Sequence, residues 1–316
     1  MLFRPTGGSI TNPMTTTGDI IYSSDNSGTA ARLGAGTDGK VLTMASGIPA
    51  WSNASAAWNY VTKTATYNPA VINDWIVCSS SSFAITLPTA VGVSGQSIIV
   101  EHAGTSLSQA YTLNTTSSQT ITGPTGAVAG GNYVLRTTGE TVWLMSDGAG
   151  WHVVYHYSST DWTDAGANTV TATTTNPTKA SGITVDKIYW RRIGKNAEFR
   201  VEYAQSNTTS AAAGSGDYLW AIPANMTIDT ATITPFTTVI GVAAATLTNA
   251  IGSGNARLNT LSNVVSVVLY DTTKVRFYFI NPTNGGFICS TSGAGFDTAN
   301  FSVNVTYSVP MVGWQP

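Results

Sequence analysis

The apolar residues of this 316-residue chain come in short pieces that Thr, Ser, Asn and Gly separate. No run approaches the roughly 20 consecutive apolar residues that a membrane-spanning helix needs, and no stretch shows the 3.6-residue period of an amphipathic helix over three turns. Short apolar pieces bounded by turn-forming residues are typical of β-strands. The pattern therefore predicts an all-β fold built from antiparallel sandwich or jelly-roll-like modules.

Charged residues make up only 9% of the chain, against about 25% in an ordinary soluble domain. A protein with so few charges would be poorly soluble if every strand face met water, and large subunit interfaces hide such surface. The net charge is −2 and no basic cluster is visible, which argues against nucleic acid as a partner. The low charge favours a homo-oligomer, and together with the N-terminal segment described below, which cannot fold alone, it leads us to expect an intertwined homotrimer.

The two cysteines, Cys78 and Cys289, lie far apart in the sequence. This spacing favours two free, buried thiols over a disulfide scaffold. The N-terminus lacks the apolar core of a signal peptide, so we expect synthesis in a cytoplasm.

The N-terminal part of the chain has too little apolar content to build a core. Residues 1–17 are predicted to be extended, either as a disordered tail or as an arm that becomes ordered on a partner. Residues 18–58 hold short apolar pairs spaced by Gly, Ser and Thr. Ordering costs about 1–2 kcal/mol per residue, so this segment is predicted to fold only against other chains or a docking surface.

Two β modules are predicted to follow, at residues 59–157 and 158–316. In the first, the turn at Asp147-Gly148 lies between two apolar strands, which is a strong hairpin signal. In the second, Ala197–Tyr203 alternates: Phe199, Val201 and Tyr203 share one face, as expected for a half-buried strand.

Several of these segments resemble parts of known phage proteins. Gly18-Asp19-Ile20-Ile21-Tyr22, Arg32 to Gly36, Gly39 to Leu42 and Pro49-Ala50-Trp51 resemble the tether found in tail fibres and other appendages of tailed bacteriophages. The order of apolar strands and the Asp147-Gly148 turn in the first module resembles a small β module frequent in phage fibres.

The C-terminal module carries a second resemblance. Tyr189 to Gly194, Leu219 to Asp229 and Pro310 to Trp314 are similar to the C-terminal β domain of many phage fibre-type proteins. The resemblance implies a virion-anchoring arm at 1–17, a tether at 18–58 and a tip domain at 158–316.

The implied function is that of a structural fibre protein of the virion. Its N-terminus would contact a tail, baseplate or capsid protein, and its C-terminal domain would mediate adsorption by binding a host-surface glycan or protein. The polar, glycine-rich segments Ser206–Gly216 and Asn281–Gly295 are the first candidates for contact, since loops on a rigid scaffold often carry binding residues. The alternatives are a capsid decoration or head fibre protein, a polysaccharide-degrading tailspike and a bacterial surface adhesin.

No catalytic group stands out, so we expect that the protein is not an enzyme and needs no cofactor. A glycosidase needs two carboxylates about 5–10 Å apart. Asp161 and Asp164 flank Trp162 but are interpreted as turn formers. The Gly-x-Ser-x-Gly nucleophile motif is missing, and the glycine-rich segments at Gly34 and Gly214 lack the lysine and the strand-to-helix context of a phosphate loop.

The histidines and tryptophans leave some choices open. His152 and His156 would lie about 13 Å apart on one strand face, which is too far to share a metal within one chain. Tyr218 and Trp220 are candidates either for stacking on a sugar ring or for core packing. The other strand tryptophans are expected in a core or an interface, and these are Trp143, Trp151 and Trp190.

Overall fold

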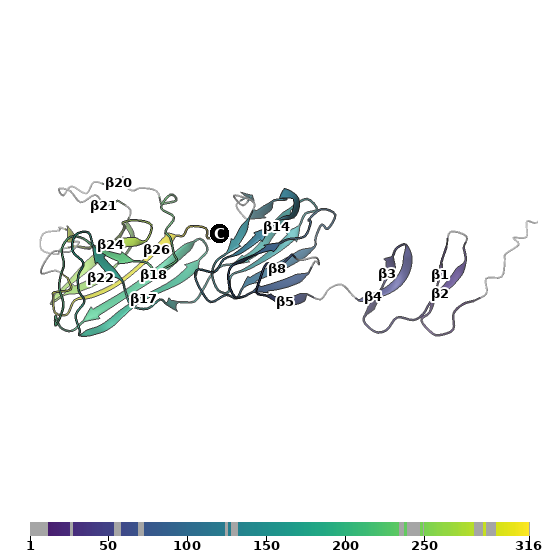
Figure 1. The fold of residues 1–316 in the computed structure, drawn as a ribbon, viewed down its shortest axis with the longest axis horizontal. Coiled ribbons are helices and arrows are strands. Elements are labelled where there is room, and N and C mark those ends of the chain that lie inside the picture. Colours follow the sequence, from purple (N-terminus) through teal and green to yellow (C-terminus); the bar gives the residue numbers. More distant parts are fainter. Residues whose placement is uncertain are drawn as a thin grey trace, which may run out of the picture. The chain divides into compact units, whose positions relative to one another are not determined.

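The computed structural model confirms the all-β prediction (Figure 1). It describes residues 12–25, 28–53, 58–68, 73–123, 126–127, 132–233, 237–238, 247–248, 250–280, 287–288 and 295–315. Over these residues there is no α-helix, and Thr116–Ser118 forms a single 3₁₀ turn. No helix in the described part is long and apolar enough to cross a membrane. The chain divides into two compact units, Met1–Trp58 and Asn59–Pro316.

The first unit contains two small hairpins. Strands β1 (Ile20–Ser23) and β2 (Ala30–Leu33) pair antiparallel, as do β3 (Lys40–Ala45) and β4 (Ile48–Asn53). The predicted tether therefore contains regular local structure. Most of the predicted arm, residues 1–11 of 1–17, lies outside the described residues.

The residues that carry the tether resemblance contact one another. The Asp19 carboxylate accepts a hydrogen bond from Thr16 Oγ1 at 2.7 Å and pairs with Arg32 Nε at 2.8 Å. These bonds, led by the one from Thr16, lower the pKa of Asp19. Trp51 Nε1 donates to the Gly34 carbonyl at 2.7 Å, and a Cβ atom at Gly36 would lie 2.6 Å from the Trp51 ring. The ion pair thus closes the first hairpin, and the Trp51 indole on β4 joins the second hairpin to the residues that follow β2.

The second unit begins with the first β module, which has a seven-stranded and a three-stranded sheet. The seven-stranded sheet has the order β11-β10-β14-β13-β8-β6-β5, and the other has the order β12-β9-β7. The bounds are β5 (Asn59–Lys63), β6 (Asp74–Cys78), β7 (Phe83–Thr86), β8 (Ser97–His102), β9 (Tyr111–Asn114), β10 (Ile121–Gly123), β11 (Gly126–Ala127), β12 (Tyr133–Leu135), β13 (Thr141–Ser146) and β14 (Trp151–Tyr157).

These sheets are mixed, which the sequence did not predict. The predicted hairpin at Asp147-Gly148 is present, because β13 and β14 pair antiparallel. However, β5–β6, β6–β8, β7–β9 and β10–β14 pair in parallel. The core of this module holds buried Trp151, Leu144 and Cys78. Burial raises the pKa of the Cys78 thiol to about 12, and Cys289 lies outside the described residues.

The C-terminal domain is built on one ten-stranded sheet. Its order is β15-β17-β18-β26-β22-β23-β24-β19-β16, and β25 pairs with β24. The bounds are β15 (Thr163–Asp164), β16 (Val170–Ala172), β17 (Ile183–Ile193), β18 (Asn196–Gln205), β19 (Tyr218–Ala221), β22 (Ala250–Leu258), β23 (Leu261–Leu269), β24 (Lys274–Ile280), β25 (Phe287–Ile288) and β26 (Ser302–Pro310). A separate short pair is formed by β20 (Thr237–Thr238) and β21 (Leu247–Thr248).

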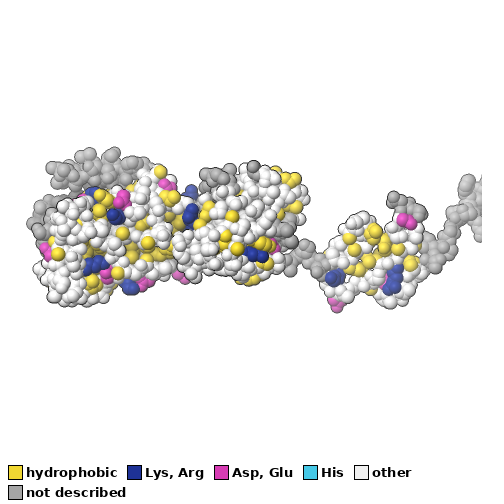
Figure 2. Space-filling model, in the orientation of Figure 1, with side chains coloured by type: hydrophobic (Ala, Val, Ile, Leu, Met, Phe, Trp, Pro, Cys, Tyr) yellow, Lys and Arg dark blue, Asp and Glu magenta, His cyan; other side chains and the backbone are white. Residues whose placement is uncertain are grey.

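This sheet folds back on itself around an aromatic core. Tyr203 on β18 and Trp220 on β19 are far apart in the strand order, yet their ring centroids are 6.3 Å apart. Trp220 also stacks on Phe277 at 4.7 Å. One curled sheet therefore supplies both layers of the predicted sandwich. Outside the core, uncharged side chains and backbone cover most of the face seen in Figure 2.

Candidate functional site

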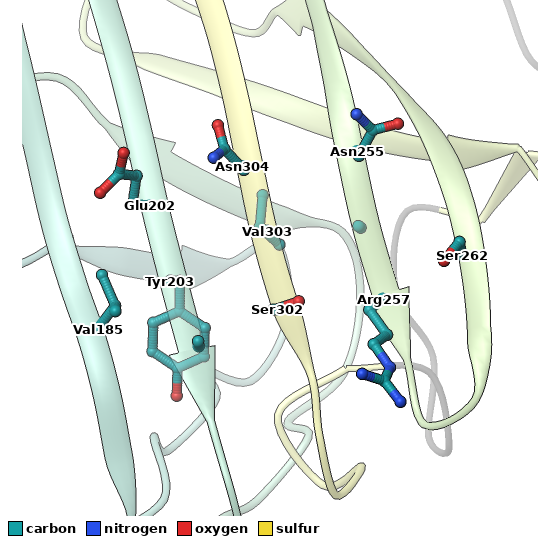
Figure 3. Close-up of a pocket in the computed structure, with 11 residues that line it drawn as sticks. Val185, Glu202, Tyr203, Asn255, Arg257, Ser262, Ser302, Val303 and Asn304 are labelled. Atoms are coloured by element: carbon teal, nitrogen blue, oxygen red, sulfur yellow. The ribbon is translucent and has the colours of Figure 1, made fainter.

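The outward face of the C-terminal sheet carries two neighbouring rows of polar side chains. In the first row, Glu202 on β18 is the register partner of Asn304 on β26, and Asn304 is the partner of Asn255 on β22. One carboxylate and two amides thus lie on adjacent strands (Figure 3).

The second row lies next to the first, two residues along each strand. Ser302 on β26 is opposite Arg257 on β22, and Arg257 is opposite Ser262 on β23. Together the two rows line an open groove of about 420 Å³, with Val185 at its β17 end. We call this the polar groove.

Alternation along the strands produces this face. Tyr203 and Val303 are only 1% and 2% exposed, whereas their neighbours Glu202 and Asn304 have the opposite orientation and reach solvent. Close approach of β22 to β26 depends on a glycine, because a Cβ atom at Gly254 would lie 2.2 Å from the Asn304 carbonyl oxygen. The same residue spacing that fills the core therefore exposes the polar groove.

Most polar groups of the groove are available to a ligand. Within the described part of the chain, the side chains of Asn255, Asn304, Ser262 and Ser302 form no hydrogen bond. Arg257 uses one nitrogen, since its Nε donates to the Asn259 carbonyl at 2.8 Å. Two amides, two hydroxyls and the end of a guanidinium group thus face solvent with free donors and acceptors.

Glu202 is held in place by its own neighbours. Its Oε1 lies 3.1 Å from Arg200 Nε. The Arg200 guanidinium in turn lies 4.4 Å from the Tyr189 ring centroid and 5.1 Å from the Trp162 ring centroid, distances at which a cation is attracted to an aromatic face. This packing orients the carboxylate at the edge of the polar groove.

The groove suits hydrogen bonding to a neutral, hydroxyl-rich ligand such as a sugar chain. Among its lining residues, Glu202 supplies the one carboxylate and Arg257 the one guanidinium. Glycoside hydrolysis generally needs a pair of carboxyl groups. The polar groove therefore has the chemistry of a binding surface and lacks the pair that hydrolysis would need.

A second cavity, of about 610 Å³, lies where the first module meets the C-terminal domain. Its lining includes Tyr157, Trp190, Asp161 and Asp164. Asp164 pairs with Lys187 Nζ at 2.6 Å and accepts a bond from the Gly166 backbone at 2.8 Å. The bond from Lys187 and that from Gly166 lower the pKa of Asp164, which is the wrong direction for a general acid.

The aromatic candidates fall into two groups. Tyr218 and Trp220 are 1% and 2% exposed, so the interpretation as core residues is confirmed and stacking on a sugar is not possible there. Trp151 and Trp190 are buried as expected. Trp143 is different, because it is 37% exposed on the outer face of β13.

Each of the two histidines on β14 has its own carboxylate partner. His152 Nε2 lies 2.8 Å from Asp147 at the surface, and His156 Nε2 lies 2.9 Å from the buried Glu140. Among the described residues, no cluster of three or more His, Cys, Asp or Glu side chains is placed to hold a metal ion.

The candidate loops give less information. Ser206–Gly216 is fixed by two isolated bridges, Thr178 to Ala212 and Thr175 to Ser215. Of Asn281–Gly295, only Phe287–Ile288 and Gly295 are among the described residues. The one sequence signal for the polar groove was the alternation along β18, which turns Glu202 away from the core. Which strands lie beside β18 is decided only by the tertiary structure.

No protein-family model matches the chain, and no curated protein matches it. A comparison with solved structures aligns it with the crystal structure of Dettilon tailspike protein (gp208), at 13% sequence identity and a TM-score of 0.30. The alignment covers 82% of this chain and 48% of that one, so it spans about half of the tailspike's length. At this TM-score a common fold is not demonstrated.

Proposed function

We propose that this chain is a structural fibre protein of a tailed phage virion that recognises the host surface through its C-terminal domain. The resemblance of residues 18–51 to phage tethers supports the first half of the proposal. The contacts of Asp19 with Arg32 and of Trp51 with Gly34 explain why these residues occur together in the motif, since they hold its separate parts together.

The observation that carries the second half is the polar groove. Asn255 and Asn304 lie side by side on adjacent strands with no hydrogen-bond partner for either amide in the described part of the chain. Such amides, flanked by Ser302 and Arg257, match the alternating donors and acceptors of sugar hydroxyls. The proposed ligand is therefore a host-surface glycan, bound without covalent chemistry.

Weak binding at one groove would be multiplied by copy number. We propose that the protein is a homotrimer, anchored through residues 1–17, so that each fibre presents three grooves. Linked sites of this kind can raise overall avidity by about 10²–10⁴. A modest affinity per groove is then sufficient for stable adsorption.

Binding of the purified protein to an array of bacterial surface glycans tests the proposal directly. Asn304→Ala should weaken binding to the preferred glycan about two- to tenfold, because each lost hydrogen bond contributes about 0.5–1.5 kcal/mol. Ser308→Ala is the matched control, since Ser308 lies outside the groove but points to the same face of β26. Equal binding by Asn304→Ala and the control would contradict the proposed site.

Two further measurements separate the proposal from its alternatives. Electron microscopy of the particle shows whether the protein lies on the tail or on the capsid, where a head fibre would be found. Incubation with host capsular polysaccharide, followed by measurement of chain length, reveals a tailspike through shortening of the polymer. Intact polysaccharide together with tail attachment is the expected result.

A further inference from the structure

A row of large apolar side chains crosses the outer face of the seven-stranded sheet. Strand register places Tyr60 beside Trp75, Trp75 beside Ile99, Ile99 beside Trp143 and Trp143 beside Tyr155. The row therefore runs without interruption over β5, β6, β8, β13 and β14. We call it the aromatic row.

The aromatic row faces solvent in the single chain. Tyr60 is 62% exposed, Tyr155 is 54% exposed and Trp143 is 37% exposed. An open hollow of about 500 Å³ lies beside it, lined by Trp143, Met145, Val154 and Tyr155. The solvent-facing side of a sheet normally carries polar residues, so these exposures are unusual for a surface that stays in water.

The surroundings of the row are also poor in charge. The adjacent row on the same face consists of Thr62, Val77, Glu101, Thr141 and Tyr157, of which Val77 is only 7% exposed. Glu101 is the one charged residue in these two rows, and one of its carboxylate oxygens already accepts a bond from Trp75 Nε1 at 3.1 Å. Exposed Tyr and Trp side chains with few charges around them are typical of a protein–protein interface.

Two observations favour a protein partner over a glycan at this place. The rings of Tyr60 and Trp75 are inclined by 59° with centroids 5.9 Å apart, so they do not form a flat platform for sugars. The indole donor of Trp75 is already used by Glu101. In contrast, the amides and hydroxyls of the polar groove, on Asn255, Asn304, Ser262 and Ser302, form no hydrogen bond within the described part of the chain.

The size of the face suits a contact between copies. On this face β5 and β6 each have two outward positions, and β8, β13 and β14 each have three. With strands about 4.8 Å apart and outward positions about 6.8 Å apart, the face covers roughly 420 Å². Two chains would together bury roughly 850 Å², close to the lower limit of about 1,000 Å² for a specific interface. A second copy of this chain brings the same low charge of 9%, so little like-charge repulsion opposes the contact.

We propose that the aromatic row is a surface through which neighbouring copies of this chain pack against each other. This inference rests on the homo-oligomer part of the proposed function and names the face that forms it. Tyr60 and Tyr155, the most exposed members, would lose their contact with water on assembly.

The first test measures mass. Native mass spectrometry and light scattering of the full chain should return an oligomer, and Tyr155→Glu should shift it to monomer at micromolar concentration. Ile193→Glu is the matched control, because Ile193 is 48% exposed on the C-terminal domain and lies outside the row. Circular dichroism of each variant verifies folding.

The second test measures how accessible position 155 is in the assembled protein, with a substitution that introduces no charge. Tyr155→Cys should react with a maleimide at least tenfold more slowly than Ile193→Cys. The reaction of the wild-type chain, which has the thiols of Cys78 and Cys289, is subtracted from both rates. A wild-type chain that is monomeric would overturn both the homo-oligomer and the inference. An oligomer that survives Tyr155→Glu, with fast labelling of Tyr155→Cys, would overturn the aromatic row alone and leave the homo-oligomer standing.

Discussion

Arg192 Nη1 lies 2.5 Å from Glu140 Oε2, and both side chains are completely buried. Glu140 belongs to the first β module, directly before β13, whereas Arg192 lies on β17 of the C-terminal domain. The other Glu140 oxygen is bonded to His156 Nε2 at 2.9 Å, and the Arg136 backbone donates to Oε2 at 2.6 Å. The two modules are therefore joined by a charge pair that water does not reach.

Loss of one partner of this pair should destabilise the protein strongly. Arg192→Ala leaves the Glu140 carboxylate buried with its main countercharge removed. We expect the free energy of unfolding to fall by about 3–5 kcal/mol, measured by urea unfolding at pH 7. Lys187→Ala is the control, because its pair with Asp164 is largely exposed and such pairs contribute about 0–1 kcal/mol. Equal losses in the two variants would contradict a special role for the buried pair.

The same carboxylate should make stability depend on pH. Burial alone raises the pKa of Glu140, but the hydrogen bond from His156 and the charge of Arg192 outweigh it, so the pKa lies below its ordinary value of 4.5. A lowered carboxyl pKa contributes stability that is present above the unfolded value and is lost as pH falls through the folded one. The free energy of unfolding, measured with urea at pH 7, 5 and 3, should therefore decrease less on acidification for Glu140→Gln than for wild type. Identical losses would refute this assignment.

Gly254→Ala should damage the polar groove through the backbone. The new Cβ atom would lie 2.2 Å from the Asn304 carbonyl oxygen, so β22 and β26 must separate. Overpacking of this kind costs about 1–3 kcal/mol, and glycan binding should fall with it. Ser253→Ala on the same strand is the control, expected to change stability by less than about 0.5 kcal/mol. An unchanged melting temperature and unchanged glycan affinity for Gly254→Ala would contradict this prediction.

Deletion of residues 1–17 should leave both β modules folded. The deleted protein should keep its melting temperature and its oligomeric state but fail to join the particle, as measured by its content in purified virions. The reverse deletion, from Ser158 onward, is not a clean test, because it removes Arg192 and leaves Glu140 buried without its partner. Point variants in the polar groove are the better measurement of adsorption.

Chelation should have no effect on folding. The histidines of β14 pair with carboxylates at 2.8 and 2.9 Å, and in the described residues no three metal-ligating side chains gather. We expect EDTA to leave the melting temperature unchanged. A large decrease would reveal a metal site in the rest of the chain or between copies.

Local pattern predicted several elements correctly. The alternation of Phe199, Val201 and Tyr203 identified the buried face of β18, and Asp147-Gly148 marked the β13–β14 hairpin. These signals are local, because side-chain period and turn chemistry depend on neighbouring residues. For Trp220 the sequence left sugar stacking and core packing open, and its 2% exposure in the structure decides for the core.

The sequence by itself determined the class of fold, the low content of charged residues and the two faces of the strand over Ala197–Tyr203. It did not determine which strands are neighbours, since parallel pairs such as β6–β8 join segments that no turn connects. Only the tertiary structure placed Asn255 beside Asn304, Trp75 beside Trp143 through Ile99, and Arg192 against Glu140. The physical reason is that these contacts depend on long-range strand order and on how the sheet curls, neither of which a period of two along one strand encodes.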